Sequence, residues 1–461
     1  MIKQILPHPA NPLSNKNLQF LKISKLQAYD GNARKHPQRQ IDKLAQSIRS
    51  YGFIIPILID AKNCIITGHA RIEAAKKIGI TEVPIIRIDH LTNLQIRAFR
   101  IADNRLAELA EWDEKFLKTE LIYLIEINTK LEIDLDISIG FETAEIDNIL
   151  NADTGEIDDI INKLEISEEK TSVTQLGDLW HLGKHKLLCA NSCDPASYQK
   201  IMQKQKAQIL CTDPPYNLPI DGFVSGKGSV KHQEFKQASG EMSQDQFKQF
   251  LKSTVMNAIN ASKDGALFYI FMDWRHDQEL QEAAKQSGLT QVNLAVWDKN
   301  SGGMGSLYRS QHELVFIYKR DRAPHINNIM LGKYGRNRTN VWRHPAANMS
   351  KEGRLALKGH PTPKPIALIM DIIKDSTKFN DIVLEPFVGS GTTILAAEKT
   401  RRRCYGIELE PAYVDLTIER WETLSGQKAI HAETQMSYSE RREGVKTREK
   451  IRNRNRRIEN G

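Results

Sequence analysis

An acidic and an aromatic residue flank a pair of prolines at Asp213-Pro214-Pro215-Tyr216. The prolines fix φ and hold the segment extended and rigid, so the carboxylate of Asp213 and the ring of Tyr216 point outward instead of collapsing. A stiff surface turn is the alternative interpretation. The position of this segment directly after the strand pattern 208–212 favours a functional site, because ligands of α/β sheets bind at the carboxyl ends of strands.

A second candidate site lies at 381–393, where a strand pattern runs into a loop containing Gly389 and Gly391 and then into a helix pattern. Glycines let the backbone approach a ligand, and an acid about 20 residues further on, here Glu408, can accept both hydroxyls of a ribose. Ile394 replaces the third glycine of the dinucleotide fingerprint, and the chain has no Gly-Lys-Ser/Thr phosphate loop here. The pattern therefore indicates a nucleoside without phosphates.

Alternating strand and helix patterns over 172–428 would position both segments on a parallel sheet covered on both faces. The expected strands are 186–189, 208–212, 266–271, 291–296, 314–319, 382–385 and 404–407. The expected helices are 243–261, 277–287, 365–376, 392–399 and 413–425.

Together, the two segments resemble the signature motifs of amino-group DNA methyltransferases, which use S-adenosylmethionine. The Asp-Pro-Pro-Tyr motif precedes the glycine motif, and this order resembles the permuted β class, many members of which make N6-methyladenine. The resemblance covers 174–426 and extends through 177–183, 297–299, 308–313 and 360–365. It implies an α/β fold with a Rossmann-like, permuted methyltransferase sheet.

The resemblance also implies a task for each motif residue. Asp213 and the carbonyl of Pro214 would accept the two N–H groups of the target amino group and make its nitrogen more nucleophilic, while Pro215 completes the rigid segment. Tyr216 would stack on a base flipped out of the duplex. Asn191 stands where the family commonly has an Asp, so it can hydrogen-bond the cofactor but carries no charge. The implied cofactor-binding residues are Asn191, Asp213, Lys364, Glu385, Phe387, Gly389, Ser390, Gly391, Thr392 and Glu408.

Recognition of the target sequence is expected in 221–239 and 323–359, which carry lysines and arginines among glycines and polar residues. Such arginines either read guanine edges or contact phosphate. The stretch 297–309 either lines the base pocket or packs in the core. The expected DNA-binding residues are Tyr308, Arg309, Arg336 and Arg338.

Near the N-terminus, Gly68-His69-Ala70-Arg71 follows a strand pattern and opens a helix pattern. Free N–H groups, the positive end of the helix dipole and Arg71 suit an anion, whereas a helix start with a surface arginine is the alternative. Residues 26–109 resemble the ParB-like domain, a small α/β domain that binds nucleotide or DNA phosphate. The five cysteines are scattered, and Cys189 and Cys193 lack the second pair of a zinc site, so we expect no metal. Some ParB-like domains are nucleases, but the sequence shows no metal-binding carboxylate cluster that would favour this activity. The pairing with a β-class methylase resembles phage and prophage DNA modification methylases and raises a restriction-modification role.

The formal charge of +8 over 461 residues is unevenly distributed. Residues 142–170 carry about −8 and 437–461 about +5, which leaves about +11 on the rest of the chain and favours double-stranded DNA as the partner. We expect a ParB-like domain at 17–113, an acidic helical connector at 114–171, a methyltransferase domain at 172–428 with target recognition including 323–359, and a basic tail at 429–461. The longest apolar run, 265–272, is far shorter than the roughly 20 residues of a membrane helix, and the start lacks a signal peptide's apolar core, so a cytoplasmic location is expected.

Three functional hypotheses remain open from the sequence. The first is a site-specific methyltransferase acting on the N6 amino group of adenine in DNA. The second moves the target to the N4 amino group of cytosine, but Asp rather than Ser before Pro-Pro-Tyr favours adenine. The third is a DNA- or nucleotide-binding regulatory protein with a degenerate methyltransferase domain, favoured by Asn191 and opposed by the intact motifs. The oligomeric state is open, a dimer included.

Overall fold

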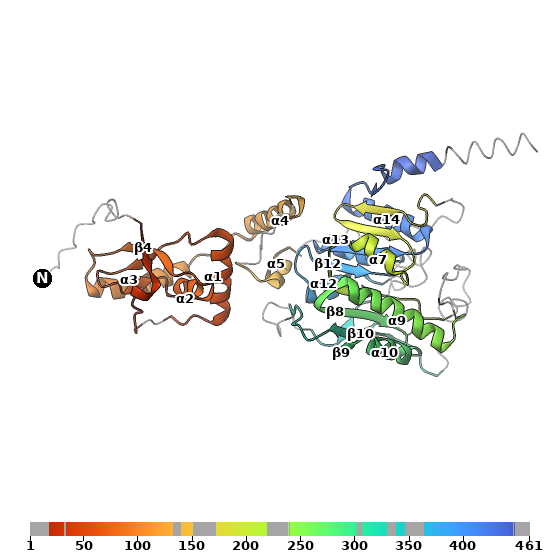
Figure 1. Ribbon diagram of the computed structural model, residues 1–461, viewed down its shortest axis with the longest axis horizontal. Coiled ribbons are helices and arrows are strands. Elements are labelled where there is room, and N and C mark those ends of the chain that lie inside the picture. The colour runs from red at the N-terminus through yellow and green to blue at the C-terminus, as the bar shows by residue number, and fades with distance from the viewer. Residues whose placement is uncertain are drawn as a thin grey trace, which may run out of the picture. The chain divides into compact units, whose positions relative to one another are not determined.

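The computed structural model describes residues 18–31, 34–131, 140–150, 172–218, 238, 240–300, 302, 307–329, 338–345, 364–445 and 447. The chain divides into two compact units, Met1–Glu142 and Thr143–Gly461 (Figure 1). Within the described ranges, no helix combines the length and the apolar character needed to cross a membrane. The same ranges contain no group of three His, Cys, Asp or Glu side chains suited to hold a metal ion.

The first unit is built on a four-stranded mixed sheet in the order β1-β4-β2-β3. Its strands are β1 (Gln19–Lys22), β2 (Ile57–Ile59), β3 (Ile65–Thr67) and β4 (Glu82–Arg87). Its helices are a 3-10 turn (Ile23–Lys25), α1 (Gln38–Tyr51), α2 (His69–Lys77), α3 (Asn93–Ala107) and α4 (Glu114–Leu131). Buried isoleucines of β2, β3 and β4 pack against α2 and form the core. The α/β expectation for this part of the chain is confirmed.

The second unit is built on a ten-stranded sheet in the order β11-β9-β10-β8-β7-β12-β13-β6-β5-β14. Its strands are β5 (Leu179–Leu182), β6 (His185–Cys189), β7 (Ala207–Thr212), β8 (Ser262–Met272), β9 (Leu289–Asp298), β10 (His312–Arg320), β11 (Val341–Arg343), β12 (Ile382–Glu385), β13 (Arg403–Glu408) and β14 (Ile430–His431). The five central strands, from β8 to β6, are parallel. The expectation of a wholly parallel sheet is wrong at the flanks, where β10, β5 and β14 run antiparallel to their neighbours. A two-residue turn joins β5 to β6, and such a short connection allows only an antiparallel pair.

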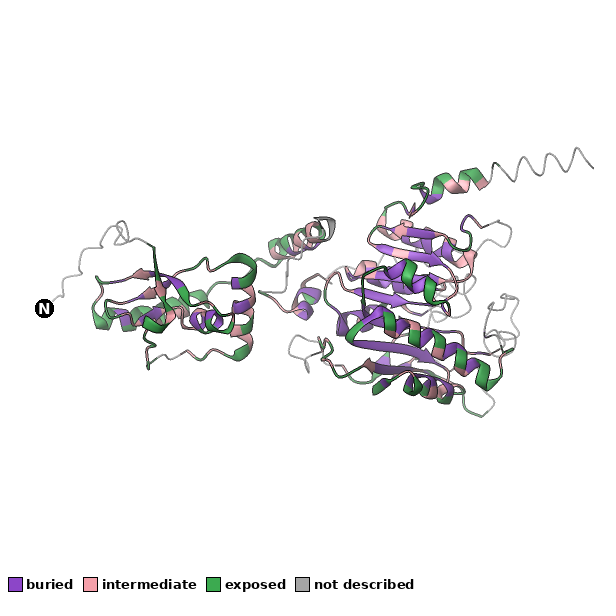
Figure 2. Ribbon diagram, in the orientation of Figure 1, coloured by how far each residue is buried: buried purple, intermediate pink, exposed green. Residues whose placement is uncertain are grey.

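Helices cover both faces of this sheet. One apolar cluster joins the sheet to α12 (Ile366–Ser376), α13 (Thr392–Lys399) and α14 (Pro411–Ser425). The other joins it to α7 (Pro195–Met202), α9 (Gln244–Ala261) and α10 (Asp277–Gln286). Figure 2 shows the central strands as almost wholly buried, as strands between two helical layers must be. This is the Rossmann-like architecture expected from the motifs.

Part of the acidic connector belongs to the core of the second unit. Helix α5 (Thr143–Leu150) carries Asp147, which is 3% exposed. Its carboxylate forms a bidentate ion pair with Arg402, itself 0% exposed, at 2.7 and 3.0 Å. The expected acidic connector thus contains a buried charge at Asp147, where a cation distant in sequence takes the place of water.

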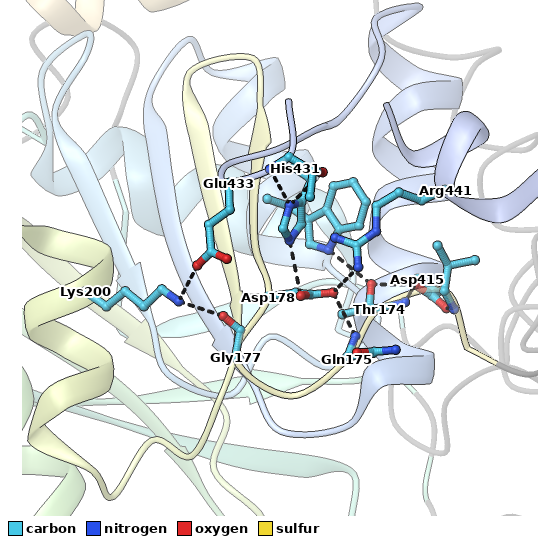
Figure 3. A network of polar contacts seen from close by, with 12 residues as sticks. Thr174, Gln175, Gly177, Asp178, Lys200, Asp415, His431, Glu433 and Arg441 are labelled. Carbon is cyan, nitrogen blue, oxygen red and sulfur yellow. Dashed lines mark hydrogen bonds and ion pairs between the residues drawn. The ribbon is translucent and has the colours of Figure 1, made fainter. Parts of the chain in front are cut away.

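The expected basic tail likewise begins as folded structure (Figure 3). His431 lies in β14, and its Nε2 atom is 3.1 Å from Asp178 Oδ1. Arg441 reaches the other oxygen of Asp178 at 3.1 Å and lies over the ring of Trp180. Tyr438 packs edge-on against the same ring. The segment expected as a basic tail, 429–461, is therefore folded against the second unit up to Arg441.

We expect Asp147→Ala to lower the free energy of unfolding of the second unit by about 3–5 kcal/mol, because it leaves a buried guanidinium without its counter-charge. Urea unfolding of the full chain measures this. Glu145→Ala is the matched control, since it removes one negative charge from the same helix at a less buried position. Equal losses in the two variants would show that the buried pair has no special contribution.

Candidate active site

The two motif segments meet because their strands are neighbours in the sheet. Strand β7 pairs in parallel with β12, with Ile209 opposite Val383 and Leu210 opposite Leu384. The carboxyl ends of both strands therefore lie at the same edge, although Thr212 and Glu385 are 173 residues apart in the chain.

Glu385 joins these two strand ends. One of its oxygens accepts hydrogen bonds from the Thr212 hydroxyl (2.6 Å) and the Phe387 backbone N–H (3.1 Å). The other accepts from the hydroxyl of Thr393, in the first turn of α13 (3.0 Å). Burial raises the pKa of Glu385 to about 8, although the three donors oppose this rise. The carboxylate that the sequence assigns to the cofactor thus faces protein donors and holds the glycine loop against the catalytic strand.

Glu408, at the end of β13, holds the glycine loop from the other side. Its two oxygens accept the backbone N–H groups of Gly389 and Glu410, each at 2.8 Å. Gly391 has φ +88°, and a Cβ there would lie 2.7 Å from Thr417 Cγ2. Only glycine fits this position without strain. The loop is therefore fixed in shape, with the Glu408 carboxylate beside it.

The other residues expected to bind the cofactor gather along the same edge. Strands β7, β12, β13 and β6 are consecutive and parallel, so the segments that follow them lie side by side. Asn191 follows β6, and its side-chain oxygen accepts the N–H of Cys193 (2.9 Å). Phe387 packs against the ring of Phe250, while Ser390 and Thr392 are buried in the loop and at the start of α13.

Four charged side chains and a tyrosine form a compact cluster behind the catalytic motif. The Tyr216 hydroxyl donates to Asp213 (2.5 Å) and to Glu313. The Lys364 ammonium lies 2.6 Å from Asp213 and 2.8 Å from Glu313. Lys299 pairs with the second oxygen of Glu313 at 2.8 Å. Two carboxylates and two ammonium groups make the cluster formally neutral.

The pKa shifts in this cluster follow from burial and these contacts. Burial raises the pKa of Asp213, while Lys364 opposes the rise. Burial acts on Glu313 in the same direction, but Lys364 and Lys299 prevail and lower its pKa to about 2. The two carboxylates raise the pKa of Lys364 against the effect of burial, and burial raises that of Tyr216 well above its usual value. Burial and Glu313 thus favour the neutral form of Asp213, and the Lys364 ammonium opposes them.

Sequence reasoning missed Glu313 and Lys299 as members of the site. Both stand in segments that carry the family resemblance, 308–313 and 297–299, and this was the available signal. Lys364 was expected near the cofactor, and its ammonium pairs with Asp213, which was expected there as well. Trp297 is buried and donates its indole N–H to the His344 carbonyl (2.8 Å), so it packs in the core.

The expected DNA-binding residues have different surroundings. Tyr308 is 84% exposed, and Arg309 donates to the carbonyl of Gly302 (2.7 Å). Arg336 lies outside the described residues. Arg338 forms ion pairs with Asp371 and Asp375 of α12 and lies over a tryptophan ring. The prediction that Arg338 binds DNA is therefore corrected. Its guanidinium is engaged within the protein, because two acids of α12 face it.

In the first unit, Gly68 caps α2 with φ +105°. The guanidinium of Arg71 folds back over it, with Nη2 3.2 Å from the point where a Cβ would stand. No hydrogen bond or ion pair to Arg71 is found among the described residues. The buried Nε2 of His69 also has no hydrogen-bond partner in that part of the structure, and burial, Arg100 and His36 lower the pKa of His69. Cationic and unpaired polar groups thus gather at one helix N-terminus.

Comparisons with known proteins agree with both units. Residues 207–419 match the family described as DNA methylase, and residues 8–105 match the ParB N-terminal domain. The Type II methyltransferase M2.DpnII of Streptococcus pneumoniae is 27% identical over 250 residues, covering 52% of this chain and 92% of that protein. M2.MboI of Moraxella bovis is 26% identical over 235 residues, covering 48% and 83%. The crystal structure of the M1.HpyAVI–SAM complex aligns with a TM-score of 0.36 and 22% identity, covering 51% of this chain and 98% of that one.

The sheet, the two strand-end motifs and the family match define the second unit as a DNA methylase domain. The chain is a DNA methyltransferase that also carries a ParB N-terminal domain.

Proposed function

We propose that this enzyme transfers a methyl group from S-adenosylmethionine to the N6 amino group of adenine in DNA. The observation that carries the proposal is the pairing of β7 with β12, which sets Asp213 beside the glycine loop that Glu385 and Glu408 hold. The target amino group, bound by Asp213 at one strand end, and the methyl donor, bound at the next, would then be within reach of each other.

The residues present fit the nucleoside part of S-adenosylmethionine. Each oxygen of Glu408 accepts one backbone hydrogen bond and retains acceptor capacity for a ribose hydroxyl. The fixed turn at Gly389 and Gly391 presents backbone without side chains, and Phe387 supplies an apolar surface next to it. When bound, the cofactor supplies an electrophilic methyl group on a sulfonium.

The residues of this chain then act on the target amino group. The lone pair of an exocyclic amine is delocalised into the base, which makes the nitrogen a poor nucleophile. Asp213 and the Pro214 carbonyl would accept its two N–H groups and draw the nitrogen toward a tetrahedral form. Tyr216 would stack on the flipped base, and the rigid Pro214-Pro215 segment would keep these groups aligned.

Adenine is favoured over cytosine by the residue before Pro-Pro-Tyr, which is Asp213 here rather than serine. The family match does not separate the two targets, because it describes a DNA methylase. Transfer to cytosine N4 is therefore the second candidate, with the same site and cofactor.

Incubation with radiolabelled S-adenosylmethionine and unmethylated duplex DNA, followed by nucleoside analysis, tests the proposal. We expect the label on N6 of deoxyadenosine. Label on N4 of deoxycytidine would select the second candidate, and no transfer at saturating cofactor would exclude both.

We expect Asp213→Ala to lower the methyl-transfer rate by about 100- to 10 000-fold, the range for loss of a group that assists proton transfer. Cofactor binding, measured by calorimetry, should survive, because Glu408 and the glycine loop are intact. Asp245→Ala, an exposed carboxylate at the start of α9, is the matched control. Retained turnover in Asp213→Ala would show that another group activates the amine.

For the ParB N-terminal domain, we propose that the start of α2 binds the phosphate of a nucleotide or of DNA. The support is the glycine cap at Gly68, the unpaired Nε2 of His69 and the position of Arg71 over that cap. A helix N-terminus with free N–H groups and a nearby guanidinium suits a phosphate.

We expect Arg71→Ala to weaken nucleotide binding about tenfold to hundredfold, as for loss of one hydrogen bond to a charged group. Titration with each of the four ribonucleoside triphosphates, and with a short duplex in parallel, measures the loss. Arg97→Ala removes an exposed arginine from the same unit and should leave binding unchanged. Equal affinities of the wild-type chain and Arg71→Ala would rule out this phosphate site.

A further inference from the structure

Two hydrogen-bond donors in the active site are each shared between the same two carboxylates. The Tyr216 hydroxyl donates to Asp213 Oδ1 and to Glu313 Oε1. The Lys364 ammonium lies within 2.6 Å of Asp213 Oδ2 and 2.8 Å of Glu313 Oε1. Glu313 comes from the second residue of β10 and Lys364 from the segment before α12, so three parts of the chain converge here.

This arrangement poses a problem for catalysis. Each oxygen of Asp213 already accepts one protein donor, so an N–H group of the target base has to compete with the Tyr216 hydroxyl and the Lys364 ammonium for the remaining places around this carboxylate. The side chain of Lys364 is only 7% exposed, and the ring of Tyr216 is held by its hydroxyl. A buried ammonium or hydroxyl that loses its hydrogen-bond partner destabilises the protein, so neither group can simply release Asp213.

We propose that Glu313 is a positioning residue, which keeps the Tyr216 hydroxyl and the Lys364 ammonium when the target amino group takes their place on Asp213. The inference rests on the proposed methyl transfer, and it explains how the Asp213 carboxylate becomes available to the target amino group. No new contact has to form, because both donors already reach Glu313. The exchange replaces two protein donors on Asp213 by one from the base without leaving a buried donor unpaired.

Lys299 is the fifth member of this cluster. It pairs with Glu313 Oε2, the oxygen that Tyr216 and Lys364 do not use. Its side chain is 29% exposed against 9% for Glu313, so it connects the buried carboxylate to the protein surface. Lys299 thereby keeps Glu313 ionised and fixed, with its other oxygen turned toward the two shared donors.

The pH dependence of kcat/KM can test the proposal, because the charged groups around Asp213 affect its pKa. The groups that act on Asp213 are Lys364, which lowers its pKa, Glu313, which raises it, and the Tyr216 hydroxyl, which lowers it. Glu385 lies at the end of the paired strand β12, and the charge of Asp213 contributes to the raised pKa of Glu385. Asp213 must be ionised to accept the N–H group. Removing the charge of Glu313 lowers the pKa of Asp213, so the acid limb of the profile moves to lower pH even as the rate falls.

The test is methyl transfer to duplex DNA by the full-length Glu313→Gln variant, with kcat, the KM for S-adenosylmethionine and the pH dependence of kcat/KM. We expect kcat to fall about tenfold to hundredfold, as for a lost hydrogen bond to a charged group, with an unchanged KM for the cofactor. The acid limb should move to lower pH. Glu398→Gln is the matched control, because Glu398 is a largely buried carboxylate of the same unit that binds His185 and Trp421 instead. It should leave both kcat and the acid limb as in the wild type.

Wild-type kcat in a folded Glu313→Gln variant, or a lower kcat without movement of the acid limb, would overturn the inference and leave the proposed function intact. Absence of transfer by the wild-type chain would overturn the proposed function and this inference with it. Where thermal unfolding shows that Glu313→Gln does not fold, Lys299→Met serves as the second variant at a more exposed position. It should lower kcat by a smaller factor at constant KM for the cofactor, and an unchanged kcat would contradict the role of Glu313.

Discussion

The active site depends on one buried carboxylate. Glu385 binds Thr212 at the end of β7, the backbone of the loop after β12, and Thr393 at the start of α13. These three donors come from the catalytic strand, the glycine loop and the helix behind it. Since a buried carboxylate is costly unless its acceptors are satisfied, the three elements are held in one arrangement. The buried core, and not the surface segments, thereby sets the distance between Asp213 and the glycine loop.

The charged cluster solves a related problem one layer away. A lone Asp213 at this depth would be driven toward its neutral form by burial, and a neutral carboxyl accepts hydrogen bonds less well. Lys364 opposes this shift, but a strict pair would hold the ammonium on the carboxylate that the substrate needs. Sharing Lys364 with Glu313 reconciles the two requirements, and Lys299 offsets the second negative charge. Charge balance within the cluster is therefore part of the catalytic design and not only of stability.

The sequence predicted those parts of the fold whose causes are local. The expected strand 382–385 and helix 392–399 coincide with β12 and α13, because an apolar run buried on both faces ends at a glycine loop. Three residues have partners that the sequence did not predict: Asp147 was expected in an acidic connector, Arg338 on DNA and His431 in a basic tail. Their partners, Arg402, Asp371 and Asp178, lie far away along the chain. The role of Glu313 was hidden for the same reason, since nothing near it in sequence reveals Tyr216 and Lys364.

The order of the two motifs along the chain is immaterial to the site, because adjacency in the sheet alone brings β7 and β12 together. The chain between Thr212 and Glu385, which are 173 positions apart, is thus available for other purposes. They build β8 to β11 on one side of β7, and two of these elements return residues to the site: Lys299 from the end of β9 and Glu313 from β10. The inserted strands therefore do more than extend the sheet. They supply Glu313, the second carboxylate on which Tyr216 and Lys364 are shared with Asp213, and Lys299, the ammonium that pairs with Glu313.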